Sequence, residues 1–123
     1  MANTILKCSN LKKSFKVRGK EIAVLKVISF SILPGEIVTI TGRSGEGKSV
    51  LLWLLGGLDK PDTGEIMYKE RSITNLTNHS LAQLRRNEIG MILQNFNLIA
   101  SWTALENVES ALRQCGLATE KKR

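Results

Sequence analysis

The residues best suited to chemistry lie in one glycine-rich stretch, Gly42 to Ser49, which reads Gly-Arg-Ser-Gly-Glu-Gly-Lys-Ser. The spacing G-x-x-x-x-G-K-[ST] is typical of a loop that binds nucleotide phosphates, provided that a strand precedes it and a helix follows. Glycines let the backbone wrap closely around an anion, so that successive N–H groups point inward. Lys48 adds a positive charge for the outer phosphates, and Ser49 adds a hydroxyl for Mg²⁺. We therefore expect phosphate binding here, rather than a plain glycine-rich turn with a solvated lysine.

The flanking sequence supplies the elements that such a loop needs. The β-branched run from Ile37 to Thr41 predicts a strand that leads into the loop. The apolar residues that follow predict a helix from Lys48 to about Leu55, which ends at the helix-stopping pair Gly56-Gly57. The stretch thus has the strand–loop–helix setting in which its spacing indicates phosphate binding.

Upstream of the loop, the sequence favours an antiparallel sheet. Residues Ile5 to Leu11 predict a short strand, and Ser14 to Arg18, followed by Gly19, predict a basic turn. Residues Ile22 to Leu33 predict a second strand, because apolar and polar residues alternate near its end. Pro34-Gly35 is a strong turn signal. We expect hairpin-like pairing in this part, without helical crossovers.

Downstream of the loop, shorter elements are predicted. Thr103 and Glu106 have the spacing of a capping box, in which each side chain satisfies a backbone N–H at the start of a helix. The predicted elements are a short strand at Glu65 to Tyr68, an amphipathic helix at Asn78 to Arg86, a buried strand at Ile89 to Leu93 ending at Gln94, a loop at Asn95 to Trp102, and a last helix after Thr103.

Composition limits the possible functions. With 123 residues, the chain forms one domain at most, and no apolar run is long enough to cross a bilayer. Residues Met1 to Asn10 lack a basic region followed by an apolar one, so no signal peptide is expected. The net charge is +7, but the basic residues are scattered without a nucleic-acid motif, so no nucleic acid is expected as a partner. Cys8 and Cys115 are far apart and predict two thiols in a reducing compartment, and His79 predicts a surface residue.

From Leu11 onward the chain resembles the N-terminal part of an ABC transporter ATP-binding subunit, with the greatest likeness to the lipoprotein-release and macrolide-export group. The resemblance is carried by stretches that keep the family's order and spacing: Val24 to Phe30, Leu33 to Glu36, Gly42 to Ser49, Gly56 to Pro61, Leu84 to Arg86, Ile89 to Leu98, and Thr103 to Val108. It implies an α/β P-loop NTPase fold of the ABC ATPase type, with an N-terminal antiparallel β-subdomain.

The resemblance also implies roles for individual residues. Phe15 stands where the family has an aromatic ring that stacks on adenine, although local packing in a turn is the alternative. Gln94 matches the Q-loop glutamine, which helps to bind Mg²⁺ and to position the attacking water. Its alternative is a polar residue that ends a strand. The Walker A residues implied to contact ATP, with Ser49 and Gln94 as the Mg²⁺ ligands, are Gly42, Arg43, Ser44, Gly45, Glu46, Gly47, Lys48, Ser49 and Val50.

Partners follow from the same likeness. Residues Asn95 to Val108 correspond to the surface that meets a transmembrane permease subunit, for which exposed Phe96, Leu98 and Trp102 would be suited, although core packing is an alternative for Leu98. In its complete form the domain pairs with a second ATP-binding subunit. The location implied is cytoplasmic, peripheral on the inner face of the cell membrane through the permease.

The sequence departs from the family in two ways. Val50 replaces a threonine and Glu46 replaces a small residue, and either change is expected to weaken ATP binding by about 1 kcal/mol. The signature motif, Walker B aspartate, catalytic glutamate and switch histidine have no counterpart in residues 1–123. We therefore expect a partial domain with an incomplete core and an exposed strand edge. As it stands, the chain is expected to bind nucleotide without hydrolysing it. The alternatives are a vestigial fragment or a basic nucleic-acid-binding domain.

Overall fold

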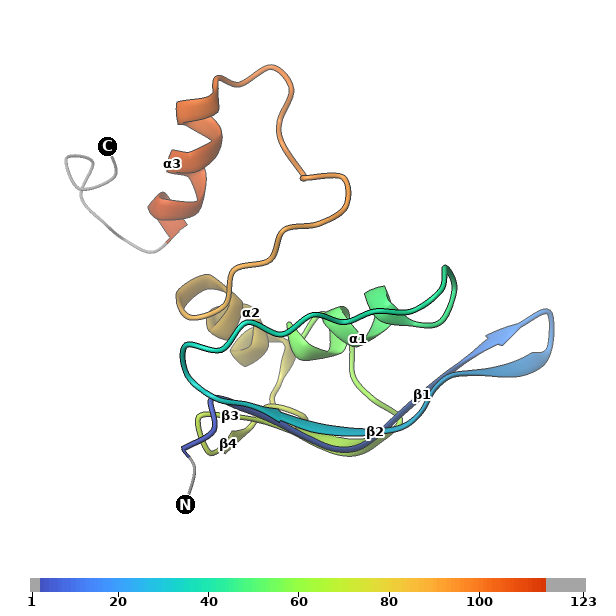
Figure 1. Ribbon diagram of the computed structural model, residues 1–123. Coiled ribbons are helices and arrows are strands. Elements are labelled where there is room, and N and C mark those ends of the chain that lie inside the picture. Colours follow the sequence, from blue (N-terminus) through green and yellow to red (C-terminus); the bar gives the residue numbers. More distant parts are fainter. Residues whose placement is uncertain (1–2, 115–123) are drawn as a thin grey trace. The chain divides into compact units, whose positions relative to one another are not determined.

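The structure, a computed structural model, describes residues 3–114. The chain divides into two compact units, Met1–Leu81 and Ala82–Arg123. The elements, shown in Figure 1, are β1 (Leu6–Val17), β2 (Lys20–Ile32), α1 (Lys48–Leu55), β3 (Thr63–Tyr68), β4 (Arg71–Ser72), α2 (Asn78–Asn87) and α3 (Ala104–Gln114).

The first unit is built on an antiparallel sheet with the strand order β2-β1-β3-β4. β1 pairs with β2 along its whole length, from Leu6 opposite Ile32 to Val17 opposite Lys20. The predicted antiparallel sheet is confirmed, but the predicted basic turn is wrong in extent. The turn consists of Arg18 and Gly19 alone, both with positive φ (52° and 79°), because the ladder continues through residues 14–17.

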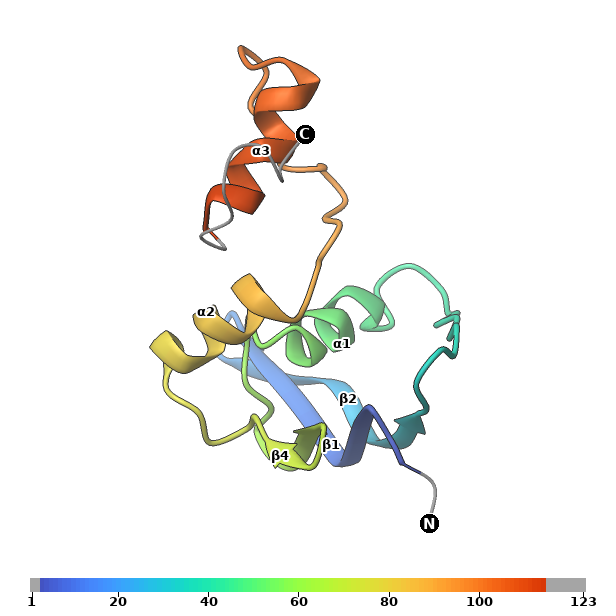
Figure 2. The ribbon, with the colours of Figure 1, turned by 90° about the vertical axis from the view of Figure 1, so that its left-hand side faces the viewer.

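The core of this unit lies between the sheet and α1. Figures 1 and 2 agree in placing α1 against one face of the sheet. The fully buried side chains come from both the sheet and α1. The buried leucines of α1, Leu51 and Leu54, are three residues apart and therefore lie on the same face of the helix. The buried hydrophobic residues among those described in this unit are Cys8, Leu11, Leu25, Leu51, Leu54, Ile66, Ile73 and Leu81.

Two predicted strands are wrong. Residues 37–41 and 89–93 form no strand, and within them Ile37 is 94% exposed and Ile92 is 89% exposed. An apolar, β-branched sequence becomes a strand only when its N–H and C=O groups pair with a neighbouring chain. No strand among the described residues pairs with either segment, so both stay unpaired. The incomplete core and exposed apolar surface expected from the sequence are present.

The helices agree better with the sequence. α1 matches the predicted helix at both ends, and α2 ends one residue beyond the predicted Arg86. In the second unit, the Thr103 hydroxyl accepts a hydrogen bond from the Glu106 N–H at 3.1 Å, so the predicted cap at the start of α3 is confirmed on its threonine side. No helix within residues 3–114 is both long and apolar enough to cross a bilayer.

Candidate nucleotide-binding site

The glycine-rich loop has the backbone geometry of an anion-binding nest. Gly45 and Gly47 have φ of 84° and 97°, a region that residues with a Cβ rarely adopt. Gly47 is also the N-cap of α1 and gives the helix no side-chain cap. The first-turn N–H groups of α1 at Lys48 and Ser49 therefore have no hydrogen-bond partner among the described residues. They are available to an anion at the positive end of the helix dipole.

The Lys48 side chain folds back over this loop. Its ammonium donates hydrogen bonds to the carbonyl oxygens of Gly42 and, at 2.8 Å, of Arg43. Carbonyl oxygens fix the position of a lysine without neutralising its charge. Lys48 is therefore held at the loop as a positive charge that can still attract phosphate, and this suits the role that its place in the motif predicts.

The Glu46 carboxylate also folds into the loop. Its Oε2 atom accepts a hydrogen bond from the Arg43 N–H at 2.6 Å, and the Glu46 N–H donates to the Arg43 carbonyl at 3.2 Å. The carboxylate lies against Gly42, where an added Cβ would come within 2.8 Å of Oε2. The sequence predicted a negative charge near the phosphates but gave no sign of this hydrogen bond.

The sheet positions the loop through one close contact. A Cβ built on Gly47 would lie 2.7 Å from the Cγ1 atom of Val24 and 3.2 Å from its carbonyl oxygen, so the loop backbone rests directly on β2. Val24 is two residues along β2 from Ile22, the partner of Phe15. The predicted adenine-stacking residue and the predicted phosphate loop are thus held by neighbouring positions of one hairpin.

The Phe15 ring is half-buried and has a charged neighbour. The Lys13 ammonium lies 5.2 Å from the ring centroid, within the range of a cation–π interaction. The ring is therefore partly accessible to a ligand, and its backbone is fixed by the pairing of Phe15 with Ile22 on β2. The stacking role of Phe15 on adenine stays a prediction.

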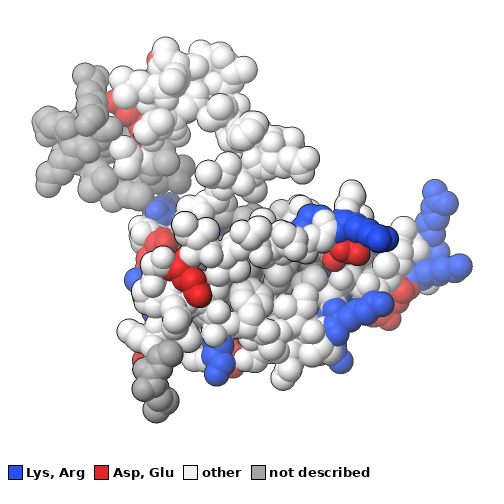
Figure 3. Space-filling view, in the orientation of Figure 1, with Lys and Arg blue, Asp and Glu red and all other residues white. Residues whose placement is uncertain are grey.

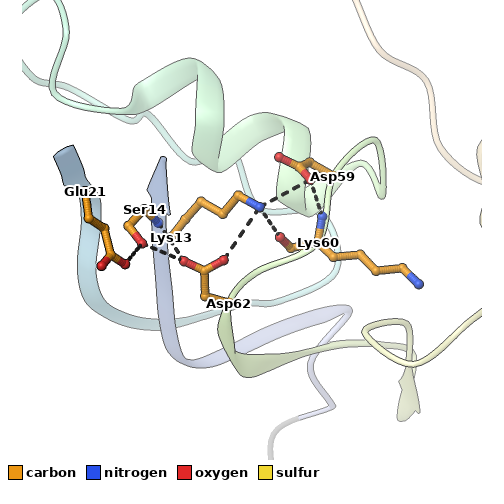
Figure 4. Close-up of polar contacts among 6 residues, drawn as sticks. All are labelled: Lys13, Ser14, Glu21, Asp59, Lys60 and Asp62. Carbon is orange, nitrogen blue, oxygen red and sulfur yellow. Dashed lines mark hydrogen bonds and ion pairs between the residues drawn. The ribbon is translucent and has the colours of Figure 1, made fainter. Parts of the chain in front are cut away.

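A polar network that the sequence did not reveal joins β1 to the segment after α1 (Figure 4). The Lys13 ammonium lies 3.4 Å from an Asp59 carboxylate oxygen and 3.8 Å from one of Asp62, and it donates to the Lys60 carbonyl at 2.7 Å. Lys13 is 46 residues from Asp59, and nothing in the local pattern pairs them. This network ties the C-terminal end of α1 to the strand that carries Phe15.

Within this network, Asp62 has a lowered pKa. The main cause is the hydrogen bond that its carboxylate accepts from the Ser14 N–H at 2.8 Å, and the Ser14 hydroxyl, at 2.9 Å, and the charge of Lys13 contribute as well. Each of these interactions favours the ionised carboxylate. The Ser14 hydroxyl also contacts Glu21 on β2 at 2.8 Å, so the network spans the hairpin.

A hollow of about 580 Å³ lies beside the network, and no residue of the glycine-rich loop lines it. Its walls come from β1, β2 and the start of β3. The lining residues are Lys12, Lys13, Ser14, Glu21, Ala23, Leu25, Lys26, Val27, Asp62 and Thr63. In Figure 3, basic side chains gather over the hairpin end of β1 and β2, with acidic ones among them. On this face, charges of both signs are mixed and no purely basic surface is seen.

The remaining predicted residues belong to the second unit. Gln94 is exposed, and its role toward Mg²⁺ and water stays a prediction. Phe96, Leu98 and Trp102 are 69%, 68% and 40% exposed, which agrees with the expectation of exposed apolar side chains. Cys115 lies outside the described residues.

The residues present fit a magnesium nucleotide. Among the described residues, no group of three or more His, Cys, Asp or Glu could hold a metal ion. Mg²⁺ that is bound mainly by phosphate oxygens and water needs only one or two protein ligands, and the Ser49 hydroxyl at the start of α1 has the chemistry to be one. The roles of the loop N–H groups, Lys48 and Ser49 toward phosphate and Mg²⁺ stay predictions.

Comparison with known proteins decides the family. The ABC transporter family model matches residues 25–123. The chain belongs to the ABC transporter family.

Relatives of this ABC transporter chain include the lipoprotein-releasing system ATP-binding proteins LolD. The LolD of Idiomarina loihiensis is 44% identical over 108 residues, which cover 88% of the chain and 47% of the relative. That of Buchnera aphidicola is 45% identical over 106 residues, covering 86% of the chain and 46% of the relative. The chain therefore spans about half the length of the curated relatives that it matches.

Solved structures show the same fold. The dimeric structure of a post-hydrolysis state of the ATP-binding cassette MJ0796, bound to ADP and Pi, matches with a TM-score of 0.88 and 38% identity, over 95% of the chain and 52% of that protein. The dimeric structure of MJ0796 as a bacterial ABC transporter cassette matches equally well. The predicted fold class, an ABC ATPase cassette with an N-terminal antiparallel sheet and a partial core, is confirmed.

Proposed function

We propose that this chain provides the nucleotide-gripping part of an ABC transporter ATPase that serves lipoprotein release or a related export process. The observation that carries the proposal is the preformed loop at the N-terminus of α1. Lys48 is hydrogen-bonded to the carbonyl oxygens of this loop, and the first N–H groups of the helix have no side-chain cap. The similarity to LolD proteins supports the lipoprotein-release assignment over other transport processes.

In this proposal, one part of the chain holds the phosphates of ATP and another holds its base. The N–H groups of the loop and the start of α1 hold the phosphate oxygens, while Lys48 approaches the outer phosphates. The Ser49 hydroxyl would hold Mg²⁺, which would offset the negative charge of the phosphates. The Phe15 ring, carried by β1 on the same hairpin that supports the loop, stacks on adenine.

Partners and location are part of the proposal. Residues Asn95 to Val108, with exposed Phe96 and Leu98, face a permease subunit, and Gln94 reports the nucleotide state to that surface. A second ATP-binding subunit pairs with the first, as in the dimeric relative MJ0796. The chain then lies on the cytoplasmic face of the membrane, where permease and ATP meet.

Hydrolysis is expected to be negligible for residues 1–123 by themselves. No apolar run that ends in Asp or Asp-Glu follows Ser49 in this sequence, and phosphoryl transfer in P-loop proteins needs such a carboxylate for Mg²⁺ and a residue that positions water. The second candidate function is therefore a nucleotide-binding fragment without turnover. The unpaired segments 37–41 and 89–93 favour it, because they leave the core incomplete.

The test is ATP binding by Lys48→Ala, measured by isothermal titration calorimetry in the presence of Mg²⁺. We expect at least about a tenfold loss of affinity, because the charge nearest the outer phosphates is removed. Lys7→Ala is the matched control, since Lys7 is exposed on β1, away from the loop.

Equal ATP affinity in Lys48→Ala and in the original chain would contradict the proposed role of the loop. ATP hydrolysis that is abolished in Lys48→Ala would instead contradict the expectation of binding without turnover. Salt-sensitive binding to nucleic acid that ATP does not affect would favour the basic-domain alternative over both.

A further inference from the structure

The Glu46 carboxylate binds within the glycine-rich loop, in which we propose that the phosphates of a nucleotide bind. Its carboxylate accepts a hydrogen bond from the Arg43 N–H at 2.6 Å. This is a short charge-assisted hydrogen bond, of the kind that phosphate oxygens form with such loops. The same oxygen lies so close to Gly42 that an added Cβ there would be only 2.8 Å away. The carboxylate is thus inside the curve of the loop.

The charge of Glu46 is not neutralised by the cations beside it. Within residues 3–114, no ion pair joins the Glu46 carboxylate to Lys48 or to Arg43. Lys48 binds carbonyl oxygens, and Arg43 contacts Glu46 through its backbone N–H and not through its guanidinium. The Arg43 side chain therefore forms no ion pair with Glu46. The Glu46 carboxylate therefore leaves a negative charge in the loop in which the phosphates of a nucleotide would bind.

The rest of the nest remains open. The N–H groups of Gly45, Gly47, Lys48 and Ser49 have no hydrogen-bond partner within residues 3–114. A phosphate chain can therefore enter, but it has to displace the carboxylate from one donor or lie beside it. A phosphate chain whose charge is partly neutralised meets less repulsion than a bare polyanion.

We propose that Glu46 is a specificity-determining residue: a built-in competitor that makes the loop select Mg²⁺-complexed triphosphates over metal-free polyphosphates. This inference rests on the proposed function. The bound metal reduces the net charge of the phosphates, and so it reduces the repulsion from Glu46. Without Glu46, the loop would bind metal-free ATP or pyrophosphate nearly as readily as the magnesium complex.

The experiment compares Glu46→Gln with the original chain by titration calorimetry with three probes: Mg²⁺–ATP, metal-free ATP in EDTA, and metal-free pyrophosphate. Glutamine keeps an oxygen for the Arg43 N–H and removes the charge. We expect metal-free ATP and pyrophosphate to bind about five- to tenfold more tightly, with a smaller gain for Mg²⁺–ATP. At high salt the gain shrinks, because the charges are exposed.

Glu36→Gln is a closely matched control. The Glu36 carboxylate accepts a hydrogen bond from the N–H of Leu33, three residues earlier, at 2.8 Å, as Glu46 does from Arg43, but in the turn after β2. It changes the net charge by the same amount outside the loop. We expect Glu36→Gln to leave all three affinities unchanged.

The outcomes separate the two proposals. If the original chain binds ATP and Glu46→Gln gains no more than Glu36→Gln, the inference about Glu46 is overturned while the proposed function stands. Binding that appears only after Glu46→Gln overturns both, because the original chain then binds no nucleotide and Glu46 blocks the loop instead of selecting the magnesium complex. No binding by either chain, with unchanged melting temperatures, overturns both. If Glu46→Gln does not fold, Glu46→Ser is used in its place, and a loss of the preference for Mg²⁺–ATP is again the expected result.

Discussion

At the scale of single residues, Gly47 is the point at which the sheet and the loop meet. It combines a φ of 97° with a backbone that rests on Val24, so a side chain there meets both conformational strain and a collision. Lys48 and Ser49 follow directly, so any shift of Gly47 moves the two side chains on which phosphate and metal binding depend.

We predict that Gly47→Ala destabilises the chain by about 1–3 kcal/mol, the cost of holding a non-glycine residue in a sparsely populated backbone region. ATP affinity should fall by at least about tenfold, since the displaced loop no longer presents its N–H groups. Thermal unfolding and titration calorimetry measure the two effects. Gly90→Ala is the control, because Gly90 has open space around its Cβ position and no positive φ. Equal effects in both variants would show that the contact with Val24 is unimportant.

The chemistry at this scale was largely readable from the sequence. The spacing of Gly42, Gly47 and Lys48 predicted an anion-binding loop, and the structure has its open N–H groups and poised lysine. The spacing could not show that Glu46 binds the Arg43 N–H, because rotamers of an exposed carboxylate depend on the three-dimensional curve of the loop.

At the scale of elements, the β1–β2 hairpin is longer than its sequence predicted. Residues 14–17 looked like part of a basic turn, but they continue the ladder with β2 up to Val17 opposite Lys20. The helices were predicted well, since helical hydrogen bonds are local. Strands 37–41 and 89–93 were predicted wrongly because strand formation requires partners that the sequence of the segment does not contain.

Asp62 fastens this hairpin to the segment that follows α1, and we predict that Asp62→Asn lowers the melting temperature near neutral pH. The carboxyl pKa is lowered from 3.8, mainly by the Ser14 N–H, so the ionised form is favoured in the folded chain. Its contribution is present above 3.8 and is lost as the pH falls through the lower folded value.

Thermal unfolding over a series of pH values measures this difference. We expect the gap between the original chain and Asp62→Asn to persist above pH 3.8 and to close as the pH falls through the lower folded pKa, because a protonated Asp62 resembles asparagine. Glu65→Gln, at an exposed position on β3, is the control and should show no such gap. A gap that stays constant with pH would mean that the charge of Asp62 plays no part.

At the scale of the whole molecule, Cys8 reports the integrity of the core. The thiol is 2% exposed, and burial raises its pKa to about 12. A thiolate is the reactive form, so both access and ionisation protect this residue. We predict that Cys8 in a Cys115→Ser background reacts with a thiol reagent only when the chain unfolds.

The labelling rate at mildly alkaline pH, followed by mass spectrometry, checks this prediction. Lys7→Cys in a background with Cys8→Ser and Cys115→Ser is the control, because Lys7 is the exposed neighbour of Cys8 on β1 and should react at once. Comparable rates at the two positions in the absence of denaturant would show that the sheet and α1 do not enclose a stable core.

The preset shape of the glycine-rich loop has a consequence for the kinetics of binding. Gly45 and Gly47 already hold their left-handed backbone angles, and Lys48 is already fastened to the loop carbonyls. The conformational entropy of the loop is therefore lost when the chain folds and not when the ligand binds. Encounter with the ligand then needs no slow rearrangement of the backbone, so differences in affinity among loop variants should arise mainly from how long the nucleotide stays bound.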